Sequence, residues 1–161
     1  MIIGAASGAF VAYIMNHASV PLLLLSALVG LFAALLPDID HPQSTAGRFF
    51  WPFSWLIAKI FGHRGITHSM VAVAGLCVML YCAWPSASEE NRSYLLAFLF
   101  GYVSHLLGDF FTPRGIPLFW PIKKNYRLAL FRTGSISETI FVVSLLGTAT
   151  FYVYWGNGYL S

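Results

Sequence analysis

Apolar runs alternate with short polar clusters along the chain, and this alternation predicts a bundle of helices. Five runs are apolar and long enough to form helices: 2–15, 21–36, 68–84, 94–111 and 136–155. The first two are each shorter than the roughly 20 residues that a membrane span needs. They could therefore be short spans, tilted spans or a hairpin that enters the membrane only part-way. The pattern predicts an all-α fold of about five helices.

Polar residues at the ends of these runs indicate where the helices begin. Thr67 and Ser93 can cap the third and fourth helices through their hydroxyl groups. Residues 135–138, Ser-Ile-Ser-Glu, fit a capping box at the start of the fifth helix. Two long connections then remain, at 37–65 and 113–134.

The first long connection carries an aromatic segment. Residues 49–59 read Phe-Phe-Trp-Pro-Phe-Ser-Trp-Leu-Ile-Ala-Lys, a pattern typical of a helix that lies in the membrane–water interface. The aromatic residues at 49–55 and 119–120 are interface anchors in this interpretation, although they could also contact a lipid substrate.

The composition places these helices in a membrane. The 161-residue chain is 58% hydrophobic and 9% charged, whereas a soluble domain carries roughly 25% charged residues. The length fits a single domain, residues 1–161. We expect an integral membrane bundle with an interfacial aromatic segment, with membrane lipids as partners. The net charge of +3 is modest and localised, which favours a role in membrane topology over nucleic-acid binding.

Basic residues are concentrated in the two long connections. If the five helices alternate in direction, the face that holds these connections is strongly basic, and the opposite face carries only Arg92. Lys and Arg are enriched in cytoplasmic loops, so we expect the basic face and the N-terminus in the cytoplasm. The basic residues on that face are Arg48, Lys59, Arg64, Arg114, Lys123, Lys124, Arg127 and Arg132.

His and Asp residues gather at the same cytoplasmic helix ends. Ionisable residues are costly in a membrane and usually mark function there. The cluster comprises Asp38, Asp40 and His41 after the second helix, His63 and His68 at the start of the third, and His105 and Asp109 in the last turns of the fourth.

The spacing of these residues fits a metal centre. His105 and Asp109 are four residues apart on a helix, so they share a face and can bind one ion. Asp38 and Asp40 flank Ile39 on a turn, where two carboxylates would repel each other without a cation. Nitrogen and oxygen donors with no Cys nearby favour Zn²⁺, with Mn²⁺ or Fe²⁺ as alternatives. Because more than four ligands are available, the centre could hold one ion or two.

Such a centre could hydrolyse a phosphoester. Two metal ions can activate water and clamp an attacked phosphoryl group. Asp38 or Asp40 could act as a ligand or as the general base, and Arg64 could bind a phosphate or stabilise developing negative charge. Glu138 is a further candidate ligand, although its position in the capping box is the simpler explanation.

Each motif alone also has a structural explanation. His105 and Asp109 could form a hydrogen bond along a helix, and Asp38 and Asp40 could serve only to end a helix. The whole protein could then be a non-catalytic, metal-stabilised membrane scaffold or a lipid-binding protein. An ion transporter fits less well, because the ionisable residues cluster at one face rather than along a path through the membrane midplane.

Three motifs carry these residues in a fixed order. They are Leu-Leu-Pro-Asp-Ile-Asp-His-Pro at 35–42, Gly-His-Arg-Gly-Ile-Thr-His-Ser at 62–69 and Gly-Tyr-Val-Ser-His-Leu-Leu-Gly-Asp at 101–109. With further matches at 112–121 and 132–138, the chain resembles the YdjM-type bacterial inner-membrane proteins over nearly its whole length.

This resemblance implies a membrane-bound metal-dependent hydrolase, distantly similar to the zinc-dependent phospholipase C and P1 nuclease group. A phosphoester, such as that of a phospholipid, is then the expected substrate. Members of the family usually carry a His before the small-residue stretch that matches residues 4–8. Here that region reads Met-Ile-Ile, so the His is lost or lies upstream. The implied ligands are His63, His68, His105, Asp109 and one or both of Asp38 and Asp40.

Overall fold

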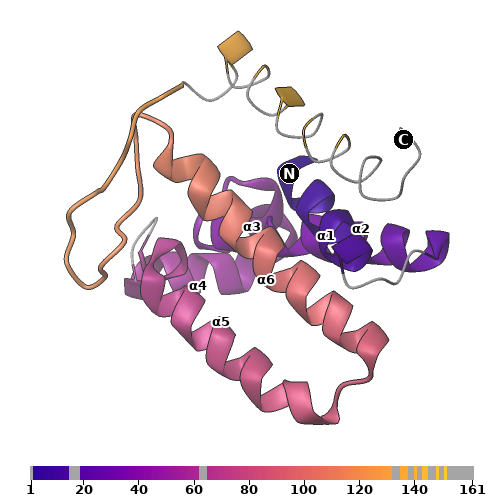
Figure 1. Ribbon diagram of the computed structural model, residues 1–161. Helices are drawn as coiled ribbons and strands as arrows, with labels where there is room; N and C mark the ends of the chain where they lie inside the picture. The colour runs from indigo at the N-terminus through magenta and orange to yellow at the C-terminus, as the bar shows by residue number, and fades with distance from the viewer. Residues whose placement is uncertain are drawn as a thin grey trace.

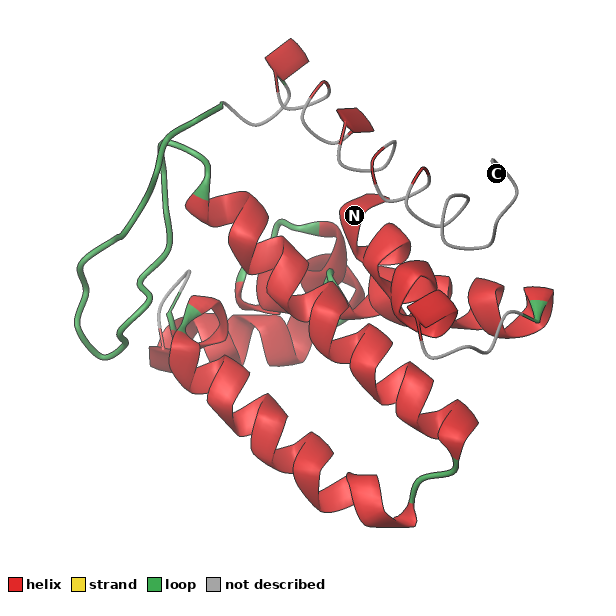
Figure 2. Cartoon of the chain, viewed as in Figure 1, coloured by secondary structure: helices red, strands yellow, loops and turns green. Residues whose placement is uncertain are grey.

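The computed structural model of the protein describes residues 2–14, 19–61 and 65–131 and isolated residues from 135 to 151. Within these residues the chain forms six α-helices and no strand, as Figures 1 and 2 show. The all-α prediction is therefore confirmed. Of the predicted fifth helix, isolated residues such as Ile140 and Ser144 are helical, and the other positions lie outside the described residues.

Three short 3-10 turns lie between α2 and α3, between α4 and α5, and between α5 and α6. In chain order the elements are α1 (Ile2–Ile14), α2 (Val20–Ala33), η1 (Pro37–Asp40), α3 (Thr45–Phe49), α4 (Trp51–Phe61), η2 (Ile66–His68), α5 (Met70–Ala83), η3 (Trp84–Ser86) and α6 (Glu89–Phe110).

The centre of the fold is a close crossing of α1, α2 and α6. A Cβ atom added at Gly30 of α2 would meet the backbone oxygen of Gly4, and one added at Gly101 of α6 would meet the backbone oxygen of Gly30. An added Cβ at Gly8 would likewise meet the backbone oxygen of Ser26. The three backbones touch directly, so only glycine fits at these positions, as small residues allow in membrane helices.

The predicted start of the fourth apolar helix, which is α6 in the structure, is wrong. α6 begins at Glu89 rather than at residue 94, and its N-cap is Ser88 rather than Ser93. The Ser88 hydroxyl accepts a hydrogen bond from the Asn91 N–H at 3.2 Å. Acidic Glu89 and Glu90 fill the first turn, where the helix dipole favours negative charge. These polar residues therefore belong to the helix.

The predicted cap of the third apolar helix, which is α5 in the structure, is also wrong. α5 begins after Ser69, not after Thr67, and the Ser69 side chain makes no capping hydrogen bond. Thr67 lies instead in η2, where its hydroxyl donates a hydrogen bond to the Asp40 carboxylate. The Thr67 hydroxyl therefore links η2 to η1 instead of capping α5.

The aromatic segment of the first connection forms α4. Trp51, Phe53 and Trp55 are each more than half exposed, whereas Ser54 is fully buried. Large exposed aromatic side chains next to a buried polar one suit a helix that rests on lipid. Its place in the membrane interface stays a prediction.

Two segments are long and apolar enough to cross a membrane, Val20–Asp40 and Glu89–Phe110. At 1.5 Å per residue, α6 with its 22 residues is about 33 Å long, which matches the hydrocarbon core of about 30 Å. The described chain also has two shorter apolar helices, Gly4–Ile14 and Met70–Ser86. The arrangement with five spans stays a prediction.

Residues 112–131 form a hairpin loop that closes the end of the bundle. Ile116 pairs with Tyr126 in an antiparallel bridge, and Ile116 is 1% exposed in a core cluster with Ala33, Tyr102 and Leu106. The Met70 N–H at the start of α5 donates a hydrogen bond to the Leu118 carbonyl at 2.9 Å. The loop thereby ties the end of α6 to the start of α5.

Candidate metal centre

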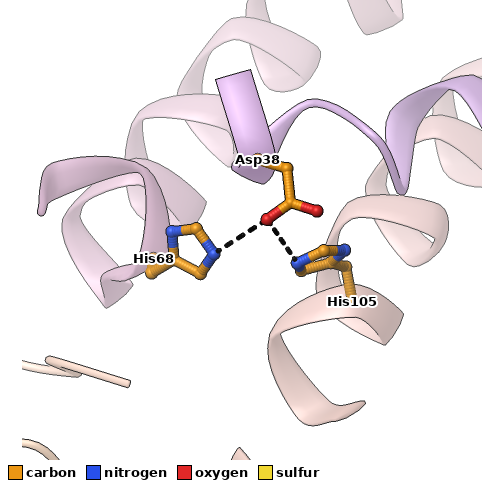
Figure 3. A group of neighbouring side chains, drawn as sticks. All are labelled: Asp38, His68 and His105. Carbon is orange, nitrogen blue, oxygen red and sulfur yellow. Dashed lines mark ion pairs between the residues drawn. The ribbon is translucent and has the colours of Figure 1, made fainter. Parts of the chain in front are cut away.

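Three elements bring donor atoms together at this end of the bundle. Asp38 comes from η1, His68 from η2 and His105 from α6, and Figure 3 shows their side chains pointing toward one another. The Asp38 Oδ1 atom lies 3.9 Å from His68 Nε2 and 3.7 Å from His105 Nε2. One donor atom from each of the three residues lies within 4.8 Å of the others.

Asp109 supplies a second carboxylate to the same group. Its Oδ2 atom lies 3.5 Å from His68 Nε2 and 3.8 Å from His105 Nε2. Each imidazole nitrogen therefore stands between two carboxylate oxygens. The predicted pairing of His105 with Asp109 across one helical turn is part of this arrangement.

These distances favour a metal centre over a set of direct ion pairs. Charge-assisted hydrogen bonds between N–H and carboxylate measure about 2.7–2.9 Å, and all four contacts are longer, at 3.5–3.9 Å. Ligand atoms about 2.0–2.1 Å from a tetrahedral zinc ion are about 3.3–3.4 Å apart. These four contacts are therefore a few tenths of an ångström longer than in a zinc site, and the donor atoms of Asp38, His68 and His105 lie within 4.8 Å of one another.

The two imidazole nitrogens support the same interpretation. His68 Nε2 and His105 Nε2 are buried and have no hydrogen-bond partner. A buried polar atom without a partner destabilises the folded state by about 1–3 kcal/mol. Two such atoms at one point would therefore destabilise this fold unless a ligand binds them. Their donor chemistry suits a divalent ion such as Zn²⁺, and the residues present therefore fit a metal.

A chain of hydrogen bonds holds the other edge of the His68 ring. His68 Nδ1 lies 3.4 Å from Asp40 Oδ2 and 3.1 Å from the Thr67 hydroxyl. The same Asp40 oxygen accepts a hydrogen bond from Thr67, and the Thr67 carbonyl accepts one from the Tyr102 hydroxyl at 2.5 Å. A carboxylate behind a histidine keeps the proton on Nδ1 and leaves Nε2 available to a metal.

The turn that carries Asp38 is fixed from the next helix. The Ser44 hydroxyl donates to the Asp38 carbonyl at 2.7 Å and accepts from the Gly47 N–H at 2.8 Å, as the N-cap of α3. An added Cβ at Gly47 would collide with the His41 carbonyl oxygen. η1 and α3 therefore pack backbone to backbone, which holds Asp38 in place.

The structure brings together Asp38, His68, His105 and Asp109 among the predicted ligands. Asp40 is fully buried on the Nδ1 side of His68, and His41 is not among the three residues whose donor atoms lie within 4.8 Å of one another. His63, Arg64 and Glu138 lie outside the described residues. Two contributors were missed from sequence, Thr67 and Tyr102; the nearest signal was the place of each inside a motif, at 62–69 and 101–109.

Known proteins match the chain at the level of sequence. A family model described as YdjM inner membrane protein matches residues 1–160. Inner membrane protein YdjM of Escherichia coli strain K12 is 42% identical over 100 residues, 62% of this chain and 51% of that protein, and the protein of the same name from Shigella flexneri gives the same values. The chain thus spans about half the length of these two relatives. Uncharacterized protein YvsG of Bacillus subtilis strain 168 is 36% identical over 132 residues, 81% of this chain and 79% of that protein. No solved structure matches the chain.

Proposed function

Because the chain belongs to the YdjM family of inner membrane proteins, we propose that it is a membrane-bound, metal-dependent hydrolase of a phosphoester. The observation that carries the proposal is the convergence of two buried imidazole nitrogens without hydrogen-bond partners, His68 Nε2 and His105 Nε2. Both face carboxylate oxygens at 3.5–3.9 Å. Zn²⁺ is the proposed ion, with Mn²⁺ or Fe²⁺ as alternatives.

Three residues are proposed as ligands, His68, His105 and Asp109, and Asp38 is proposed as a further ligand or as the general base. A divalent ion bound there would supply Lewis acidity toward a phosphoryl oxygen and make water a stronger acid. A donor set of histidine and carboxylate with no thiolate is typical of catalytic zinc sites rather than structural ones. The proposal therefore favours chemistry over a purely structural role.

Asp38 marks the accessible side of the centre. Its side chain is 34% exposed, whereas His68 is fully buried and Asp109 is 16% exposed. A substrate would approach past Asp38, and this carboxylate is the group best placed to accept a proton from water. Asp40 is buried behind His68, so its proposed role is to position that ring rather than to touch the substrate.

Four further residues keep roles that rest on the sequence motifs. Arg64 is proposed to bind the substrate phosphate, and His63 to serve a second ion if the centre holds two. His41 and Glu138 are further candidates for that second ion. The site and the N-terminus are proposed to face the cytoplasm, with the chain crossing the bacterial inner membrane several times.

Turnover of a chromogenic phosphodiester, bis-p-nitrophenyl phosphate, by the Zn²⁺-loaded protein in lipid nanodiscs tests this proposal. We expect Asp38→Asn to reduce the rate by about 100-fold or more, because a general base or ligand is removed. Glu90→Gln, at the far end of α6, is the matched control and should leave the rate unchanged.

The competing role is a metal-stabilised scaffold. Stoichiometric metal in the wild type without turnover of this diester or of a phospholipid would favour the scaffold. Full activity of Asp38→Asn would contradict the role proposed for that carboxylate.

A further inference from the structure

The hairpin at residues 112–131 projects from the bundle on a firmly held base. The Leu128 and Leu130 N–H groups donate hydrogen bonds to the carbonyls of Phe110 and Phe111 at 2.9 and 2.8 Å. The bridge between Ile116 and Tyr126 continues this pairing. Figure 1 shows the loop at the edge of the molecule, beside the end of α6 and the start of α5. Its position is therefore set by backbone hydrogen bonds to the end of α6.

The tip of the hairpin, residues 119–126, is organised by side chains. The Phe119 and Tyr126 rings pack edge to face with centroids 5.3 Å apart. The Lys124 Nζ atom lies 5.6 Å from the centre of the Tyr126 ring, and Asn125 Nδ2 donates to the Arg114 carbonyl at 3.2 Å. These contacts between side chains and with the backbone therefore give the tip a defined surface.

The tip combines positive charge with exposed apolar side chains. Residues 110–131 contain four basic residues and no acidic one. Lys123 and Lys124 are exposed. Near them in the chain, the apolar side chains of Phe119 and Ile122 are 54% and 58% exposed. Lysines alone would suit any anionic polymer, but exposed Phe and Ile beside them gain free energy only in an apolar environment.

We propose that residues 119–126 bind the headgroups of anionic phospholipids at the membrane surface. Phe119 and Ile122 lie at the boundary between headgroups and acyl chains, and Lys123 and Lys124 contact the phosphates. Each basic residue at an anionic surface strengthens association about fivefold. This surface does not depend on the metal centre, so it can be tested whether or not the protein is a hydrolase.

A fluorescent label at position 122 reports on this contact. Ile122→Cys is labelled with an environment-sensitive NBD dye in a chain in which Cys77 and Cys82, both free and exposed, are replaced by Ser. The full chain is reconstituted in nanodiscs of phosphatidylcholine alone or of equal parts phosphatidylcholine and phosphatidylglycerol. We expect a blue shift of the dye emission only with phosphatidylglycerol, and its loss at high salt.

Two controls make the result specific. Lys123→Gln with Lys124→Gln should abolish the blue shift while the protein stays monodisperse. A dye attached at Ser86→Cys should not respond to phosphatidylglycerol, because η3 follows the end of α5 that is opposite to the hairpin.

Three results would overturn the proposal. The first is the same emission in both kinds of nanodisc. The second is a blue shift that persists without the two lysines. The third is a response to a short DNA duplex but none to phosphatidylglycerol, which would assign the surface to nucleic acid.

Discussion

His68 is held between carboxylates on both edges of its ring. Asp109 Oδ2 lies 3.5 Å from Nε2, and Asp40 Oδ2 lies 3.4 Å from Nδ1. The Thr67 hydroxyl and Asp40 hold the Nδ1 edge, and this orients Nε2 toward the proposed ion. Carboxylates in the position of Asp40 commonly fix the tautomer and raise the basicity of a metal-binding histidine.

Thr67 tests this positioning without touching the proposed ion. We expect Thr67→Val to weaken Zn²⁺ affinity by about 10- to 100-fold, because Asp40 loses the hydroxyl donor that holds it. Thr67→Ser keeps the donor and should keep the affinity. Competition with a chromogenic chelator measures the affinity, and the Co²⁺ absorption spectrum of each variant reports the ligand geometry.

Equal affinities and spectra for the two Thr67 variants would contradict this role. A loss of affinity in Thr67→Ser as well would show that the methyl group, rather than the hydroxyl, matters.

Of the predicted ligands, Asp38, His68, His105 and Asp109 lie together in the structure, but the sequence did not predict how Asp38 and Asp40 divide their roles. Both carboxylates follow Pro37, and the sequence leaves open whether one or both of them bind an ion. In the structure they lie in a 3-10 turn, where each residue rotates the chain by about 120°. Two positions apart, the side chains diverge, and Asp40 reaches Nδ1 of His68 rather than Nε2. The turn type depends on packing against α3, which local sequence does not reveal.

Among the helices, the crossing of α1, α2 and α6 positions His105 and Asp109 relative to Asp38. Gly30 stands where α2 touches both neighbours. Any shift of α2 against α6 would move Asp38, five residues beyond the end of α2, away from His105. The metal centre therefore depends on a contact between backbones made deeper in the bundle.

Substitution of Gly30 measures that contact. We expect Gly30→Ala to lower the free energy of unfolding by about 1–3 kcal/mol, because the added methyl group collides with the Gly4 backbone. Gly75→Ala in α5 is the matched control, since an added Cβ there has no atom within 4 Å. It should be neutral or stabilising by up to about 1 kcal/mol. Thermal unfolding in detergent, followed by circular dichroism, compares the two, and equal stability would contradict the close crossing.

Sequence patterns predicted the apolar helices well where apolar runs were uninterrupted. α1, α2 and α5 match the predicted runs within three residues at either end. The start of α6 was missed because its first turn is polar, Glu89-Glu90-Asn91-Arg92, and hydropathy alone separates such a turn from a helix. The docking of the hairpin at 112–131 on α5 could not be predicted from the sequence, because its hydrogen bond joins residues far apart in the chain, Met70 and Leu118.

For the whole molecule, the distribution of basic residues predicts the orientation in the membrane. The hairpin carries Lys123 and Lys124, whereas the start of α6 carries Glu89 and Glu90 beside Arg92. Positive charge in short loops favours the cytoplasmic side, whereas acidic residues contribute little.

Labelling of single cysteines tests this orientation. In a chain without Cys77 and Cys82, we expect Glu90→Cys to react with a membrane-impermeant maleimide in intact spheroplasts. Lys124→Cys should react only after the membrane is permeabilised. The reverse pattern would place the metal centre on the periplasmic side.

The central claim is that the His and Asp residues of α6 help to bind a metal ion. Metal content per chain, measured by mass spectrometry on detergent-purified protein, tests it most directly. The wild type should carry at least one equivalent of a transition metal, and His105→Ala/Asp109→Ala should carry none while keeping its helical content. An absence of bound metal after reconstitution with Zn²⁺ or Mn²⁺, with wild type and variant equally stable, would contradict the account.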